Sequence, residues 1–261
     1  MNLVLLGNAQ TRTLAAGTPE AAHVAQTLKL ARGGTFWCGV KNGARGLATI
    51  REIAPDGEIS FSIEWEKSPP PVLPPIALLV GLSRPQTMKK VFALASEIGC
   101  ARIDVFRSEK GDPAYAQSSI WARGDRTLDE ILEKSAAQTT VPAVPAFALH
   151  ASLAEFLKNG GNAEARVNEF RFAADVYERA QAFAAVPAFP PGAHVQIAVG
   201  SERGWADSER AALRAAGFSF VHLGARVLRT ETAVAASLAV AFSKLPAALA
   251  PHVPLSFPEK I

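Results

Sequence analysis

Cysteine is scarce in this sequence. Cys38 and Cys100 are the two cysteines among 261 residues, and neither belongs to a spacing typical of a metal site. A small disulfide-stapled scaffold is therefore excluded, and the reducing cytoplasm is the expected compartment. We also expect no metal ion in the functional site.

Long apolar runs and nucleotide-binding motifs are absent as well. No run approaches the about 20 apolar residues of a membrane helix, so we expect no membrane partner. The apolar start, MNLVLLGNAQ, has no basic segment before it, which predicts a first strand rather than a signal peptide. Neither a GxGxxG loop nor a P-loop is present, which leaves dinucleotide and NTP binding without motif support.

Charge of one sign is missing from each of two neighbouring segments. The net charge of +3 is too small to argue by itself for a nucleic-acid partner, but residues 29–51 carry no acid and residues 52–66 carry no base. The first segment could form a basic face that meets phosphates. Alternatively, the two segments pair as neighbouring strands. The basic residues are Lys29, Arg32, Lys41, Arg45 and Arg51.

Turn signals and prolines divide the chain. Residues 35–66 predict β structure, with hairpin turns at residues 41–43 and at Asp56-Gly57. Five prolines between Pro69 and Pro75 predict a stiff extended linker, because proline fits neither a central strand nor a helix interior. We place a domain boundary there.

The part of the chain after the linker alternates between segments with the pattern of a strand and segments with the pattern of a helix. Strands are expected at residues 76–82, 102–106, 169–176, 195–199 and 218–223. Helices are expected at residues 85–98, from Thr127, from Ser152, from a cap at Asp207, and up to Pro246. This alternation predicts a mostly parallel α/β sheet behind a small β domain.

Two expected strands end in loops that contain glycine. One loop covers residues 199–205 and the other residues 223–232. Ligands bind beyond the carboxyl ends of the strands in open α/β sheets, and glycine lets a backbone approach a ligand closely. Ordinary strand-to-helix turns would give the same pattern.

The second loop carries a specific resemblance. Residues 223–233, LGARVLRTETA, resemble the LGxRILRxETA signature of the RsmE family of 16S ribosomal RNA methyltransferases, members of the knotted SPOUT class. Four further segments agree in order: PEAAHVAQTLKLARGGTF with the HxxxVLRxxxGD segment of a PUA-like barrel, ASEIGCARIDVFRSEK with the family's helix–strand segment, AAQTTVPAVP with EQSxRxxxP, and AVGSERGW with an IGPEGG-type loop.

The resemblance implies an architecture and an activity. Residues 1–72 would form a PUA-like β-barrel RNA-binding domain, and residues 73–248 a SPOUT methyltransferase domain with a C-terminal trefoil knot. The protein would be a homodimer that binds S-adenosyl-L-methionine. It would methylate N3 of a uridine in 16S ribosomal RNA or in the assembled small ribosomal subunit.

The resemblance also implies roles for particular residues. His23 matches the barrel motif, and with Lys29, Arg32, Lys41 and Arg45 it is a candidate RNA contact. Candidates for catalysis are Arg229, Glu202 and Arg226, since uracil N3 gains negative charge as it loses its proton. The residues expected to bind the cofactor are Val199, Gly200, Ser201, Glu202, Gly204, Leu223, Gly224, Val227, Leu228, Arg229, Thr230 and Glu231.

Four positions depart from the family pattern. Ser201 and Arg203 replace a proline and a glycine, and Val141 and Ala137 replace an arginine and a glutamate. If Arg203 filled the pocket, the protein would be an RNA-binding SPOUT protein that has lost catalysis; action on another RNA is the other alternative.

Overall fold

The computed structural model describes residues 2–159, 168–178 and 180–246. Its contacts divide the chain into two compact units. Within the described ranges, the first unit contains residues 2–72 and 133–144, and the second contains residues 73–132, 145–159, 168–178 and 180–246. None of the described helices is long and apolar enough to span a membrane.

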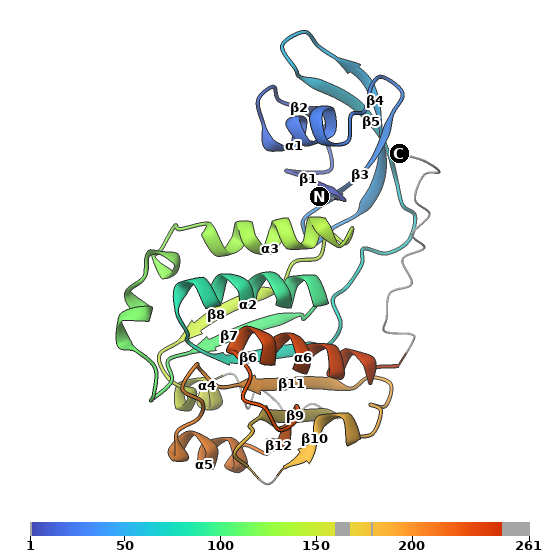
Figure 1. The fold of residues 1–261 in the computed structure, drawn as a ribbon. Helices are drawn as coiled ribbons and strands as arrows, with labels where there is room; N and C mark the ends of the chain where they lie inside the picture. Colours follow the sequence, from blue (N-terminus) through green and yellow to red (C-terminus); the bar gives the residue numbers. More distant parts are fainter. Residues whose placement is uncertain (1, 160–167, 179, 247–261) are drawn as a thin grey trace. The chain divides into compact units, whose positions relative to one another are not determined.

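The first unit is built on a curled five-stranded sheet (Figure 1). Its strands run in the order β1-β3-β4-β5-β2, and the β3–β4 and β4–β5 pairs are antiparallel, as the hairpin signals predicted. Asn42 and Gly57 take the positive φ values that these turns require, 55° and 95°. The bounds are β1 Val4–Leu6, β2 Thr13–Leu14, β3 Thr35–Val40, β4 Arg45–Ile53 and β5 Ile59–Trp65, with α1 at Pro19–Ala22 followed by a π-helical turn at His23–Thr27.

The second unit is built on a seven-stranded sheet in the order β10-β12-β9-β11-β6-β7-β8. Every neighbouring pair is parallel, which confirms the predicted mostly parallel sheet. Strands β8 and β10 were not expected from the sequence. The bounds are β6 Ile76–Gly81, β7 Arg102–Phe106, β8 Ala146–His150, β9 Glu169–Ala174, β10 Gln181–Ala182, β11 His194–Val199 and β12 Ser219–His222.

The order of the strands in the sheet differs from their order in the chain. Strand β11 enters between β9 and β6, β12 lies on the other side of β9, and helix α6 (Thr230–Ser243) then returns to pack against β11, β6 and α2 (Pro85–Ile98). Figure 1 shows α6 lying across this part of the sheet beside α2. A return of this kind is what the predicted C-terminal knot requires.

Three helices were predicted from capping residues, and all three are present, but only one cap is as expected. Helix α4 (Leu153–Asn159) follows Ser152, whose hydroxyl accepts the N–H of Glu155. Helix α3 (Thr127–Gln138) begins at the expected residue, but the side chain at its start that accepts a backbone N–H is Asp125, which accepts the N–H of Thr127. The expected cap at Asp207 is wrong: α5 (Asp207–Ala215) follows Ala206, whose N–H is accepted by the carboxylate of Glu209.

Candidate functional site

A pocket of about 270 Å³ lies at the carboxyl ends of β9, β11 and β12, where an α/β sheet binds ligands. The first turn of α6 closes one side of it. Ligand pockets commonly measure about 300–1,000 Å³, so this cavity lies just below that range and suits a small molecule rather than a large ligand. The pocket is lined by Ala174, Asp175, Val176, Tyr177, Val199, Gly200, Ser201, Glu202, Arg203, Gly204, Trp205, Leu223, Gly224, Arg226, Val227, Leu228, Thr230 and Ala233.

Two glycines among the lining residues have open space where a side chain would stand. Gly204 and Gly224 have φ values of +67° and +114°, and a Cβ at either position would meet no atom within 4 Å. The space beside both Cα atoms therefore belongs to the pocket, which brings backbone groups within reach of a ligand. Val199, Leu223 and Leu228 supply apolar side chains to the same wall.

The loop after β11 is packed tightly against its surroundings. A Cβ on Gly81, at the end of β6, would lie 2.5 Å from the backbone nitrogen of Ser201. The N–H of Gly204 donates to the carbonyl of Ser201 at 2.8 Å, closing the turn. Trp205 stacks on Phe106 with 5.7 Å between ring centroids, so its indole is a core group.

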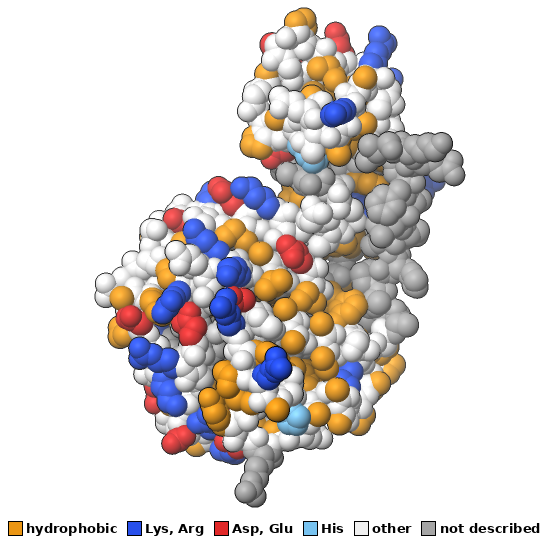
Figure 2. All heavy atoms as spheres, viewed as in Figure 1, with side chains coloured by type: hydrophobic (Ala, Val, Ile, Leu, Met, Phe, Trp, Pro, Cys, Tyr) orange, Lys and Arg blue, Asp and Glu red, His pale blue; other side chains and the backbone are white. Residues whose placement is uncertain are grey.

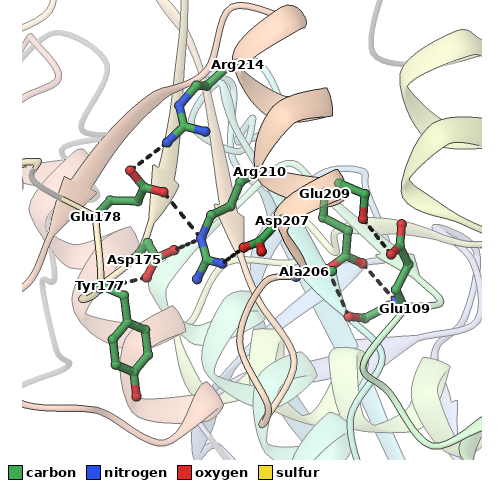
Figure 3. Close-up of polar contacts among 11 residues, drawn as sticks. Glu109, Asp175, Tyr177, Glu178, Ala206, Asp207, Glu209, Arg210 and Arg214 are labelled. Carbon is green, nitrogen blue, oxygen red and sulfur yellow. Dashed lines mark hydrogen bonds and ion pairs between the residues drawn. The ribbon is translucent and has the colours of Figure 1, made fainter.

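A buried carboxylate fixes the end of this loop through backbone hydrogen bonds. Glu209, only 3% exposed, accepts the N–H of Ala206 at 2.8 Å and the N–H of Glu109 at 2.9 Å (Figure 3). The Ser108 hydroxyl lies 3.3 Å from the same carboxylate and 3.4 Å from the hydroxyl of Ser201. Glu209 thus joins the segment after β7 to the segment that shapes the pocket.

Glu202 performs a structural task. Its Oε1 accepts the backbone N–H of Arg84 at 3.2 Å and the hydroxyl of Thr87 at 3.1 Å. Arg84 immediately precedes α2, so the Glu202 carboxylate caps that helix and compensates its positive N-terminal end. The guanidinium of Arg84 donates to the Tyr115 hydroxyl, which raises the pKa of Arg84.

The polar start of α6 is satisfied within the chain. The Glu231 carboxylate lies 3.3 Å from the ammonium of Lys90 on α2. The backbone N–H of Glu231 and the Lys90 contact lower the pKa of the Glu231 carboxyl. Thr230 is buried beside the pocket, whereas Arg229 is exposed just before the helix.

Ion pairs fix the loop after β9. Arg210 on α5 pairs with Asp175 at 2.7 Å and lies 3.4 Å from Glu178, which also pairs with Arg214 at 2.6 Å. Asp175 accepts the N–H of Tyr177 at 2.9 Å. In Figure 3 the Tyr177 ring points away from these charges.

The structure brings most of the predicted cofactor residues together. All of them line the pocket except Arg229 and Glu231, and the catalytic candidates Arg226 and Glu202 line it too. Asp175 and Tyr177 also line the pocket but were not predicted from the sequence. They lie at the carboxyl end of a strand that was expected, so the rule for the carboxyl ends of strands could have found them.

The candidate RNA contacts of the first unit differ in accessibility. Lys29 and Arg32 are exposed, and His23 is half-buried. Lys41 is exposed but lies 2.9 Å from Glu133. Arg45 is only 4% exposed, since it pairs with Glu66 and lies over the Trp37 ring, so its side chain offers no free surface to RNA.

Metal ligands do not gather in the described part of the chain: no group of three His, Cys, Asp or Glu side chains there could hold an ion. Both cysteines are buried. Burial raises the pKa of the Cys38 thiol and of the Cys100 thiol to about 12, so both are protonated at neutral pH.

Comparisons with known proteins agree with this geometry. A family model described as an RNA methyltransferase domain matches residues 70–242. The chain is 28% identical over 218 residues to ribosomal RNA small subunit methyltransferase E of Treponema pallidum, covering 84% of this chain and 80% of the relative. It is 25% identical to methyltransferase E 1 of Borreliella burgdorferi, covering 94% and 99%.

A solved structure supports the fold. The small subunit methyltransferase E of Neisseria gonorrhoeae, crystallised with S-adenosyl methionine, is 21% identical and has a TM-score of 0.73, covering 93% of this chain and 97% of that one. This likeness confirms the predicted fold class, a SPOUT-type mostly parallel sheet with a smaller N-terminal barrel-like domain.

Proposed function

Because the chain belongs to the RNA methyltransferase family whose model covers residues 70–242, we propose that it is an S-adenosylmethionine-dependent ribosomal RNA methyltransferase. The proposed target is N3 of a uridine in 16S ribosomal RNA. The names of the relatives support the coarser part of this target, ribosomal RNA of the small subunit. One observation carries the proposal: the LGARVLRTETA segment lines a pocket at the carboxyl ends of three parallel strands.

The pocket suits the proposed cofactor in its chemistry. Backbone at Gly204 and Gly224 borders open space, which admits a ligand close to N–H and C=O groups. Val199, Leu223 and Leu228 would contact the adenosine, and Thr230 lies at the helix start beside them. S-Adenosylmethionine, when bound, supplies an activated methyl group.

The residues of the chain would position the uracil and stabilise its charge. The N3–H of uracil is a weakly acidic imide, so a nearby cation helps as the proton leaves. Arg226 is exposed and lines the pocket, which makes it the best placed of the candidate catalytic residues. Glu202 is a positioning residue, because its Oε1 already caps α2. Arg229, just outside the lining, would act on the phosphate backbone.

The first domain would bind the RNA. We assign RNA binding to residues 1–72 and methyl transfer to residues 73–248, of which residues 1, 160–167, 179 and 247–248 lie outside the described residues. Lys29 and Arg32 are the exposed cations of the basic segment and would contact phosphates. N3 lies on the Watson–Crick edge, so the target uridine must be unpaired.

The exposed face of α6 would join two copies of the chain. Figure 2 shows hydrophobic side chains gathered over this helix. Ala235, Ala236, Ala239 and Val240 are small and not fully buried, which allows a second subunit to pack closely. The proposed protein is therefore a homodimer that acts on the small ribosomal subunit, and we place it in the cytoplasm.

The first test is calorimetric titration with S-adenosylmethionine. We expect the wild type to bind and Ala233→Phe to bind at least about tenfold more weakly, because Ala233 lines the pocket. Ala211→Phe, on the exposed face of α5, is the matched control. Small ribosomal subunits from a strain that lacks the gene should then gain N3-methyluridine when they are incubated with the protein and S-adenosylmethionine.

The alternative, RNA binding without catalysis, predicts a folded protein that does not bind the cofactor. Arg203 motivates it, but this side chain is exposed at the pocket and leaves the cavity open. The absence of both cofactor binding and N3-methyluridine would favour that alternative.

A further inference from the structure

An exposed aromatic ring stands beside the pocket. Among the described residues, three large hydrophobic side chains are strongly exposed: Val72, Tyr177 and Val227. Tyr177 is 75% exposed and Val227 70%, and both line the pocket. An exposed ring adds little to the stability of the fold, whereas exposed apolar groups that gather at a cavity mark a binding surface.

The backbone that carries Tyr177 is held in place. Asp175 accepts the N–H of Tyr177, and the same carboxylate pairs with Arg210. Glu178, on the other side of the tyrosine, pairs with Arg214 and lies beside Arg210. A ring on a fixed loop loses little conformational freedom when a ligand stacks on it, which favours binding.

Two cations share the rim with this ring. Arg203 and Arg226 are exposed and line the same pocket. Within residues 2–159, 168–178 and 180–246, no hydrogen bond or ion pair joins either guanidinium to another side chain. An aromatic face with free guanidinium groups suits a nucleotide, because the base stacks on the ring and the phosphates meet the cations.

We propose that Tyr177 is a stacking platform for an unpaired nucleobase of the RNA substrate, and that Arg203 holds the phosphate next to that base, while Arg226 remains with the uracil. This inference rests on the proposed methyl transfer to RNA and adds the residues that capture the substrate. The buried lining residues, such as Val199 and Trp205, lie on the closed side of the pocket, which leaves the open side to RNA.

The stacking role is tested with a short fluorescent oligouridylate. Anisotropy gives its dissociation constant in the presence of saturating S-adenosylmethionine. We expect Tyr177→Ala to weaken binding by about 5- to 140-fold, the range for loss of one stacked base. Tyr177→Phe keeps the ring and should stay within about twofold of wild type. Val72→Ala, which removes an equally exposed apolar side chain outside the pocket, should change nothing.

The role of Arg203 is tested through salt. Arg203→Ala should reduce the slope of log binding constant against log salt by about 0.7, the value for one phosphate contact in a single strand. Arg123→Ala removes an exposed positive charge that does not line the pocket, and its slope should equal that of the wild type.

Several results would overturn the inference. An unchanged oligouridylate affinity in Tyr177→Ala would do so. Equal losses of cofactor and RNA affinity would instead place the ring in the cofactor pocket. A changed sedimentation coefficient with unchanged RNA affinity would place it in a subunit interface.

The stacking role of Tyr177 and the proposed methyl transfer can be refuted independently of each other. A wild type that binds oligouridylate through Tyr177 but forms no N3-methyluridine refutes the function alone. Normal methylation of small subunits by Tyr177→Ala, with unchanged kcat and KM, refutes the inference alone.

Discussion

The carboxylate of Glu209 accepts the backbone N–H of Glu109, 100 residues away in the sequence, at 2.9 Å. The same side chain accepts the N–H of Ala206 at 2.8 Å. One buried acid therefore ties the segment after β7 to the residue before α5, which directly follows the loop that lines the pocket. The shape of that loop depends on a residue that does not itself line the pocket.

Glu209→Ala should lower the free energy of unfolding by about 1–3 kcal/mol, because it leaves buried N–H donors without an acceptor. It should also weaken S-adenosylmethionine binding, since the loop it holds forms the pocket wall. Urea denaturation and calorimetric titration measure the two effects. Glu109→Ala keeps the backbone donor, removes only an exposed hydrogen bond from the Ser208 hydroxyl and serves as the control. Equal losses in both variants would contradict this role.

Glu202→Gln should retain most of the methyl-transfer activity. A glutamine oxygen can still accept from the N–H of Arg84 and the hydroxyl of Thr87, so the cap on α2 survives. Glu202→Ala should lower the free energy of unfolding by about 0.5–2 kcal/mol, the usual effect of a lost cap. The kcat of each variant is measured against pH on small subunits. A loss of about 100-fold or more in the glutamine variant, with the fold intact, would instead make Glu202 a general base.

The pair of Glu231 and Lys90 should stabilise the protein in a pH-dependent way. The pKa of Glu231 is lowered in the folded state, so its contribution is present above the pKa of an unfolded glutamate, about 4.3, and is lost as the pH falls through the folded value. The difference in free energy of unfolding between wild type and Glu231→Gln should therefore shrink on acidification. Lys90 is largely exposed, which limits the pair to about 1 kcal/mol at most. A difference that grows on acidification would refute the assignment.

Gly81→Ala should deform the pocket by displacing the loop after β11. A Cβ there would lie 2.5 Å from the nitrogen of Ser201, so the backbone after β11 must move. We expect weaker S-adenosylmethionine binding together with a lower melting temperature. Gly7→Ala meets no atom within 4 Å and is the matched control. If both variants bind the cofactor like wild type, the loop position does not matter for binding.

Thiol reagents should not label the native protein. Cys38 and Cys100 are buried, and burial raises the pKa of each thiol to about 12. Reaction needs the thiolate, so a colorimetric thiol assay near pH 8 should detect no thiol until urea is added, and two thereafter. Rapid labelling of the folded protein would show that one of the two sites opens.

The sequence predicted the elements whose patterns are local. The hairpin turns at Asn42 and Gly57, the helix from Pro85 to Ile98 and five of the strands of the parallel sheet followed from turn residues, caps and apolar runs. Strand β8 was not predicted, because AFALH is short and lies among prolines. Helix α5 was assigned the wrong cap, because Asp207 is the more familiar capping residue.

The site was only partly predictable, since its remaining parts depend on contacts distant in sequence. The glycine loops after β11 and β12 identified most of the lining. No local pattern could show that Glu202 caps α2, that Arg45 is buried against Glu66, or that Arg210 reaches Asp175. Pairings across tens of residues become visible only when the chain is folded.

The position of β11 also has a consequence for synthesis of the protein. This strand, residues 194–199, fills the centre of the sheet between β9 and β6, yet most of the chain leaves the ribosome before it. Until then the apolar strand β6 has an unpaired edge, which is prone to aggregation. The nascent chain must keep this edge covered by other means, and truncation before residue 194 would release a polypeptide that cannot close its own sheet.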